Sequence, residues 1–114
     1  MRYLLIHCPD NQAPAHTSLP SDLAASLSSW LEETIGAGIN LGGAKLQAAS
    51  RARCVRVRDG QVLVSDGPFA ETKEQVAGYD VIECADLRQA VDVASRHPTA
   101  VLGAIEIRPI ADDG

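Results

Sequence analysis

The segment ARCVRVRDGQVLVSDG, residues 52–67, decides how this chain folds. Valine alternates with polar residues on both sides of Asp59-Gly60, and such a dipeptide between alternating runs is a strong signal for a two-residue hairpin turn. Pairing outward from the turn puts the valines of both strands on one face and sets Arg53 opposite Asp66 on that same face. We therefore expect the Asp66 carboxylate to point inwards, towards a buried or cleft surface and beside a cation.

The rest of the chain supplies further strands and two amphipathic helices. Apolar residues recur at helical spacing from residue 21 to about 36, and again between residues 86 and 97, where Pro98 is expected to stop the helix. Strands are predicted at residues 2–8, 40–47, 75–84 and 100–110, and a loop at residues 9–20.

This order of elements predicts an α+β fold. Two helices over a mainly antiparallel sheet form a ferredoxin-like sandwich, in which the helices cover one face of the sheet. The other face needs a cover as well, and a second copy of the chain supplies one. We expect a homodimer.

Composition narrows the function classes. The chain has 114 residues and a net charge of -5, which fits one domain over residues 1–114 and argues against nucleic acid or an anionic membrane as a partner. No apolar run approaches the ~20 residues of a membrane span, and the N-terminal apolar stretch is too short for a signal peptide. We expect a cytoplasmic protein whose three cysteines are reduced.

Several motifs occur together in order: D-G-P-F-x-E-x-K-E from residue 66, the glycine pair Gly42-Gly43, and the closing I-E-x-R-P from residue 105. In this combination the chain resembles the YCII-related domain family, in the branch named for its DGPF tetrapeptide, over residues 1–110. The resemblance implies a ferredoxin-like unit that pairs into a dimeric α/β barrel. It also implies a possible enzyme, since founding members look like enzymes with a His-Asp pair and some relatives act on halogenated aromatic compounds.

Five residues are candidates for a site. Asp66 and His7 are the catalytic candidates, and they form an acid-base couple if their strands are neighbours. Arg53, Phe69 and Glu71 are the candidates for binding substrate.

Four of the candidates also have a structural interpretation. Asp66 before Gly-Pro can close an Asx-turn, with Phe69 filling the core, and Glu71 can lie in a solvated turn. His7 can be a satisfied core histidine. His97, at a helix end, is interpreted only as a favourable dipole contact.

Two functional hypotheses follow. The first is a small-molecule enzyme that performs acid-base chemistry, without cofactor or metal, in a cleft near the tetrapeptide. The second is a non-catalytic ligand-binding or regulatory homodimer, in which the tetrapeptide holds a corner of the fold.

Overall fold

The computed structural model describes residues 1–9, 21–67 and 76–111, with the backbone alone at residues 21–23. The strands are β1 (Arg2–Pro9), β2 (Asn40–Lys45), β3 (Arg53–Arg58), β4 (Gln61–Asp66), β5 (Gly78–Glu83) and β6 (Gly103–Pro109). The helices are α1 (Ser21–Gly36), α2 (Leu87–Ser95) and α3 (Pro98–Leu102), and a 3₁₀ turn spans Ala49–Arg51.

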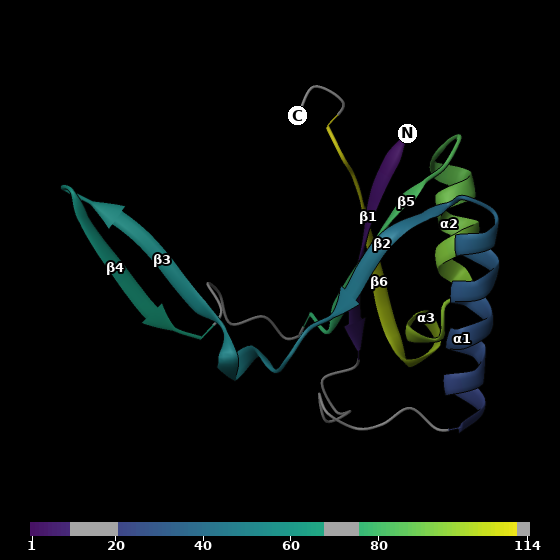
Figure 1. Cartoon of the computed structure of the whole chain (residues 1–114), viewed down its shortest axis with the longest axis horizontal. Helices are drawn as coiled ribbons and strands as arrows, with labels where there is room; N and C mark the ends of the chain where they lie inside the picture. The colour runs from purple at the N-terminus through teal and green to yellow at the C-terminus, as the bar shows by residue number, and fades with distance from the viewer. Residues whose placement is uncertain (10–20, 68–75, 112–114) are drawn as a thin grey trace.

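Four strands form an antiparallel sheet in the order β2-β5-β1-β6. Helices α1 and α2 lie together on one side of this sheet (Figure 1). This is the predicted ferredoxin-like α+β architecture, in which β1 and β5 are the central strands. Because β1 and β5 have neighbours on both sides, side chains on their helix-facing surface are the best shielded from water.

The core fills the space between the sheet and the helices. Alternate residues of β1 and β5 point towards the helices, as the twofold period of a strand requires. The buried cluster consists of Tyr3, Leu5, Trp30, Ile82, Cys84, Ala90, Val93 and Ala94. Burying one large apolar side chain contributes about 1.5–3 kcal/mol, so this cluster holds the helices on the sheet.

Strands β3 and β4 form a separate two-stranded sheet. In the sequence this hairpin lies between β2 and β5, which pair directly with each other in the four-stranded sheet. The predicted register is confirmed, with Arg53 opposite Asp66. The hairpin extends away from the four-stranded sheet (Figure 1), and its valines are exposed in the single chain. The expected inward direction of Asp66 is therefore wrong for the single chain: parity gives the shared face, but nothing among the described residues covers that face.

The second helical region differs from its prediction. Asp86 caps α2, as its side chain accepts the Gln89 N–H at 2.9 Å. Helix α2 ends before Pro98, as predicted, but Pro98 also begins a second, short helix, α3, whose N-cap is His97. Proline fits the first helical position because the N–H group that it lacks would have no intrahelical partner there.

No helix in the described part of the chain is long and apolar enough to cross a membrane.

Candidate active site

Two buried polar side chains meet on the helix-facing side of the sheet. His7 on β1 is 6% exposed and Asp80 on β5 is 8% exposed. Strand pairing sets Leu5 opposite Asp80 and His7 opposite Gly78, so His7 and Asp80 are diagonal neighbours across one pair of strands. His7 Nε2 lies 2.6 Å from Asp80 Oδ2.

The proton positions at this contact follow from the chemistry of the two groups. An ionised carboxylate can only accept, so an ionised Asp80 requires the proton on His7 Nε2. In neutral imidazole the other nitrogen then carries a lone pair. His7 Nδ1 is buried and has no hydrogen-bond partner among the described residues. Leaving such a group unsatisfied costs about 1–3 kcal/mol, which makes this nitrogen the chemically notable atom of the site.

Asn40 fixes the other oxygen of Asp80. Its Nδ2 donates to Asp80 Oδ1 at 3.2 Å, and its own Oδ1 accepts the Gly42 N–H at 2.9 Å. The pairing of β2 with β5 shifts register between Asn40 and Gly42, and Gly42 has a φ of +138°. This bulge turns the Asn40 amide back towards Asp80, a typical use of a bulge beside a site.

Gly43 provides the space in which the Asp80 carboxylate lies. A Cβ at this position would overlap the Tyr79 carbonyl oxygen and Asp80 Oδ1. The glycine pair of the sequence thus has two separate tasks. Gly42 adopts a backbone conformation that other residues rarely take, and Gly43 leaves room for the buried acid.

His97 completes the cluster from the helical side. Its ring stacks on the His7 ring, with centroids 4.2 Å apart and planes inclined by 15°. Its Nδ1 accepts the Thr99 N–H at 3.0 Å, and the residue as a whole is 5% exposed. Burial, and secondarily the neighbouring His7, lowers the pKa of His97 to about 4, although Asp80 acts in the opposite direction. The expected role as a simple dipole contact is wrong.

His7, Asp80 and His97 are also the described residues that can hold a metal ion together, since they offer donor atoms within 4.8 Å of one another. Their geometry fits a hydrogen-bonded pair better. His7 Nε2 and Asp80 are at hydrogen-bonding distance from each other, and His97 Nδ1 already accepts a backbone N–H. Lone pairs lie in the ring plane, so two nearly parallel stacked rings do not converge on one ion.

The predicted candidates divide into separate places. Arg53 Nε lies 3.1 Å from Asp66 Oδ1, as expected, but the Asp66 side chain is 89% exposed. The expected His7–Asp66 couple is not formed, because β1 pairs with β5 and β6 whereas β4 pairs with β3. Phe69 and Glu71 lie outside the described residues.

Sequence reasoning missed Asp80, Asn40 and His97. The signal for Asp80 is in the strand itself, where it occupies the same face as Ile82 and Cys84, both buried. An acid on the buried face of a central strand is unusual, and needs a partner.

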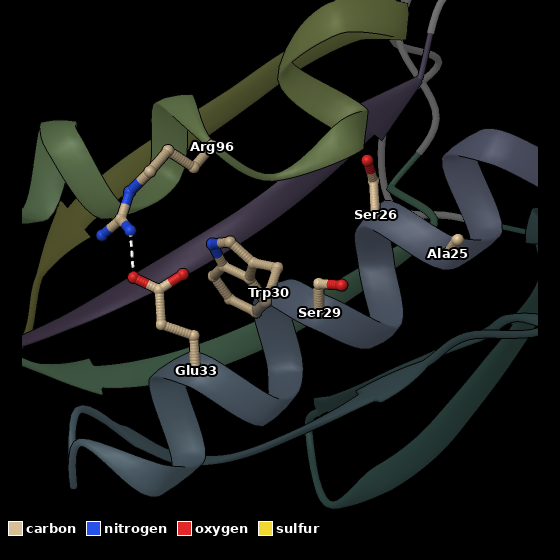
Figure 2. Close-up of a pocket in the computed structure, with 6 residues that line it drawn as sticks. All are labelled: Ala25, Ser26, Ser29, Trp30, Glu33 and Arg96. Carbon is tan, nitrogen blue, oxygen red and sulfur yellow. Dashed lines mark hydrogen bonds and ion pairs between the residues drawn. The ribbon is translucent and has the colours of Figure 1, made fainter.

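The larger of the two described pockets lies beside this cluster. It has a volume of about 360 Å³ and is lined by Ala25, Ser26, Ser29, Trp30, Glu33 and Arg96. Figure 2 shows the indole of Trp30 between the α1 serines and the Arg96–Glu33 ion pair. Trp30 links this pocket to His97. The Trp30 and His97 rings meet edge-on, with their centroids 4.7 Å apart. Neither described pocket includes His7 or Asp80 in its lining.

The YCII-related domain model matches residues 1–112. The chain belongs to the YCII-related domain family. A curated relative, the uncharacterized protein R00369 of Rhizobium meliloti (strain 1021), is 42% identical over 72 residues, which is 60% of this chain. The match spans 56% of that relative, so the chain covers little more than half of its length.

A solved structure supports the fold of this YCII-related protein. It is TftG, the 5-chloro-2-hydroxyhydroquinone dehydrochlorinase from Burkholderia phenoliruptrix AC1100, in complex with 2,5-dihydroxybenzoquinone. The two share a TM-score of 0.52 over 97% of this chain and 94% of that chain, at 12% sequence identity. At this identity the likeness shows a shared fold.

Proposed function

We propose that this YCII-related protein is a small-molecule enzyme that performs acid-base chemistry with His7 as its base. The observation that carries the proposal is the buried, unpartnered Nδ1 of His7, on a ring whose Nε2 meets Asp80 at 2.6 Å. Histidine suits the task because its ordinary pKa of ~6.5 lets it take and return a proton near neutral pH.

In the proposed reaction, His7 Nδ1 takes a proton from a C–H, O–H or N–H group of the substrate. The ring becomes an imidazolium, with Nε2–H still donating to Asp80. The Asp80 carboxylate stabilises this positive charge without itself taking the proton. Returning the proton from Nδ1 to another substrate atom, or to the leaving group, closes the cycle. These steps need no group beyond the chain's own residues.

The site of the reaction is the end of β1 that carries His7. Ala77 donates its N–H to the carbonyl oxygen of His7 at 2.8 Å. This contact joins the residues that lead into β5 to the reacting end of β1.

We propose further that the protein acts as a homodimer. The sheet face opposite the helices carries Leu4, Ile6 and Val81, which are only half-buried in the single chain. An antiparallel sheet with an apolar second face gains stability when that face is covered. The exposed valines of the hairpin add to the apolar surface available for a second copy.

The alternative, a non-catalytic ligand-binding homodimer, is favoured by one observation. The two pockets described above are lined by neither His7 nor Asp80. Under this alternative His7 and Asp80 form a hydrogen-bonded internal pair with a structural role, and ligand binding takes place without proton transfer.

The test begins with a ligand screen by thermal shift, because a ligand that binds only the native state at 100 times its Kd stabilises it by ~2.7 kcal/mol. Compounds that stabilise the protein are then assayed for turnover with wild type, Asp80→Asn and Asp66→Asn. In the Asp80→Asn variant the new side-chain amide would donate to Nε2 of His7, which would move the ring proton to Nδ1 and remove the base.

We expect Asp80→Asn to lower turnover roughly 10²- to 10⁴-fold while binding persists. Asp66→Asn is the matched control, since it makes the same chemical change at an exposed site. Turnover that survives in Asp80→Asn but is lost in Asp66→Asn would refute the assignment and return the chemistry to the hairpin. Binding without turnover in any of the proteins would favour the alternative.

A further inference from the structure

We propose that His97 is a positioning residue that holds the plane of the His7 ring; this inference rests on the proposed function of His7. His97 lies between two rings. One is His7, stacked at 4.2 Å, and the other is Trp30, which meets it edge-on at 4.7 Å with an inclination of 80°. Trp30 is itself anchored, since its Nε1 donates to the Val93 carbonyl at 2.8 Å.

The backbone determines which nitrogen of His97 carries the proton. His97 is the N-cap of α3, and its Nδ1 accepts the Thr99 N–H at 3.0 Å. An accepting nitrogen has no proton, so the neutral ring carries its proton on Nε2. Protonating Nδ1 would break this cap. The helix start thus fixes both the orientation of the ring and its neutral form.

The stack supplies a constraint that the contact with Asp80 lacks. The hydrogen bond from Nε2 holds one corner of the His7 ring, but the ring plane can still tilt about that corner. A flat neighbour only 15° from parallel removes this freedom. With both constraints in place, the lone pair on Nδ1 points in one fixed direction. A general base needs such a fixed orientation towards the proton that it removes.

The neutral form of His97 has a second effect, on the protonated state of His7. A positive His7 ring would lie against the face of an uncharged aromatic ring, which is a favourable arrangement for a cation. A charged His97 would instead place two like charges 4.2 Å apart, between ring centroids. The cap on α3 therefore keeps His97 in the form that suits proton uptake by its neighbour.

Two substitutions separate the ring from the cap. His97→Asn keeps a side-chain acceptor suited to an N-cap but removes the ring, whereas His97→Phe keeps a ring but removes the acceptor. The measurement is ¹⁵N and ¹H NMR of His7 in the full chain, which reports its tautomer and the exchange rate of the Nε2 proton. In His97→Asn we expect exchange to be about 2- to 12-fold faster, the factor that matches the loss of one aromatic pair.

In His97→Phe we expect the His7 tautomer to persist and the exchange rate to stay within about twofold of wild type. Equal exchange rates in wild type and His97→Asn would overturn the proposal, as would an increase in exchange rate in His97→Phe as large as that in His97→Asn. If His97→Asn does not fold, His97→Gln replaces it, since glutamine also lacks the ring, and His97→Phe must still retain the tautomer.

These readouts use the protein without substrate. A failure here leaves the turnover test of Asp80→Asn untouched, and a failure of that test leaves the ring geometry measured here intact. The two results therefore separate the positioning role of His97 from the catalytic role of His7.

Discussion

The stability of this protein should depend on pH through His97. Burial first, and then the neighbouring His7, lowers the pKa of His97 to about 4, whereas the same side chain in the unfolded chain titrates near 6.5. Between these values the unfolded chain binds a proton that the native protein does not. The free energy of unfolding therefore rises with pH in this window. The part of it that comes from neutral His97 is lost as the pH falls from about 6.5 to about 4.

The size of the effect follows from the two pKa values. At pH 5 the unfolded His97 is almost fully charged and the native one almost fully neutral, so stability is about 2 kcal/mol lower than at pH 8. His97→Phe and His97→Asn both remove the titrating group. Each should show a stability difference between pH 8 and pH 5 that is smaller than that of wild type by about 2 kcal/mol, whatever its absolute stability.

The assay is urea unfolding at pH 8, 6.5 and 5, followed by the fluorescence of Trp30, the chain's single tryptophan. Protein concentration is held constant, because association would shift the apparent stability by mass action. The rest of the chain is the same in all three proteins, so the difference from wild type reports His97 together with its coupling to the neighbouring His7. If the variants keep the pH dependence of wild type, His97 is not held neutral by burial and the reasoning fails.

Three further substitutions test the surroundings of Asp80 and the hairpin, each by urea unfolding at pH 7.5. Gly43→Ala should lower the free energy of unfolding by about 1–3 kcal/mol, because the new Cβ overlaps a backbone carbonyl and the Asp80 carboxylate; an unchanged value would mean that β2 shifts freely. Asn40→Ala should cost about 1–3 kcal/mol by leaving a buried carboxylate oxygen without its donor, and no loss would show that water replaces the amide. Asp66→Asn should change stability by less than about 1 kcal/mol, since its ion pair with Arg53 is exposed; a larger loss would revive the corner role of the tetrapeptide.

Local pattern was sufficient to predict much of the fold. The register of the hairpin follows from the Asp59-Gly60 turn and is confirmed residue by residue. Alternation in β6 likewise puts Ile105 and Ile107 on one face, because strand period is a local property, and the structure packs that face against the core. Whether a strand face is covered by other parts of the protein is not a local property. The valine face of the hairpin has the same pattern as a core strand, yet it is exposed in the single chain.

The candidate site shows the same division. His7 was predicted as a proton carrier from its place on a strand, but its partner depends on which strand lies beside β1. Nothing in the local sequence gives the order β2-β5-β1-β6, which puts Asp80 rather than Asp66 next to His7. The contact between His97 and His7 was harder to predict, because it depends on where α2 ends and on the start of a new helix, α3, at Pro98.

Features that are far apart in the chain act on one imidazole ring. The glycine pair shapes β2 and leaves space for Asp80, Asp80 holds Nε2 of His7, and the His-Pro step that begins α3 presents His97 to the ring face. For stability alone, two well-packed apolar residues would serve at least as well as this pair, since the attraction between buried polar groups rarely exceeds their desolvation penalty. The chain instead uses a bulge, a missing side chain and a helix cap around a ring whose second nitrogen has no described partner. Such an arrangement is understandable if the nitrogen serves a reactant.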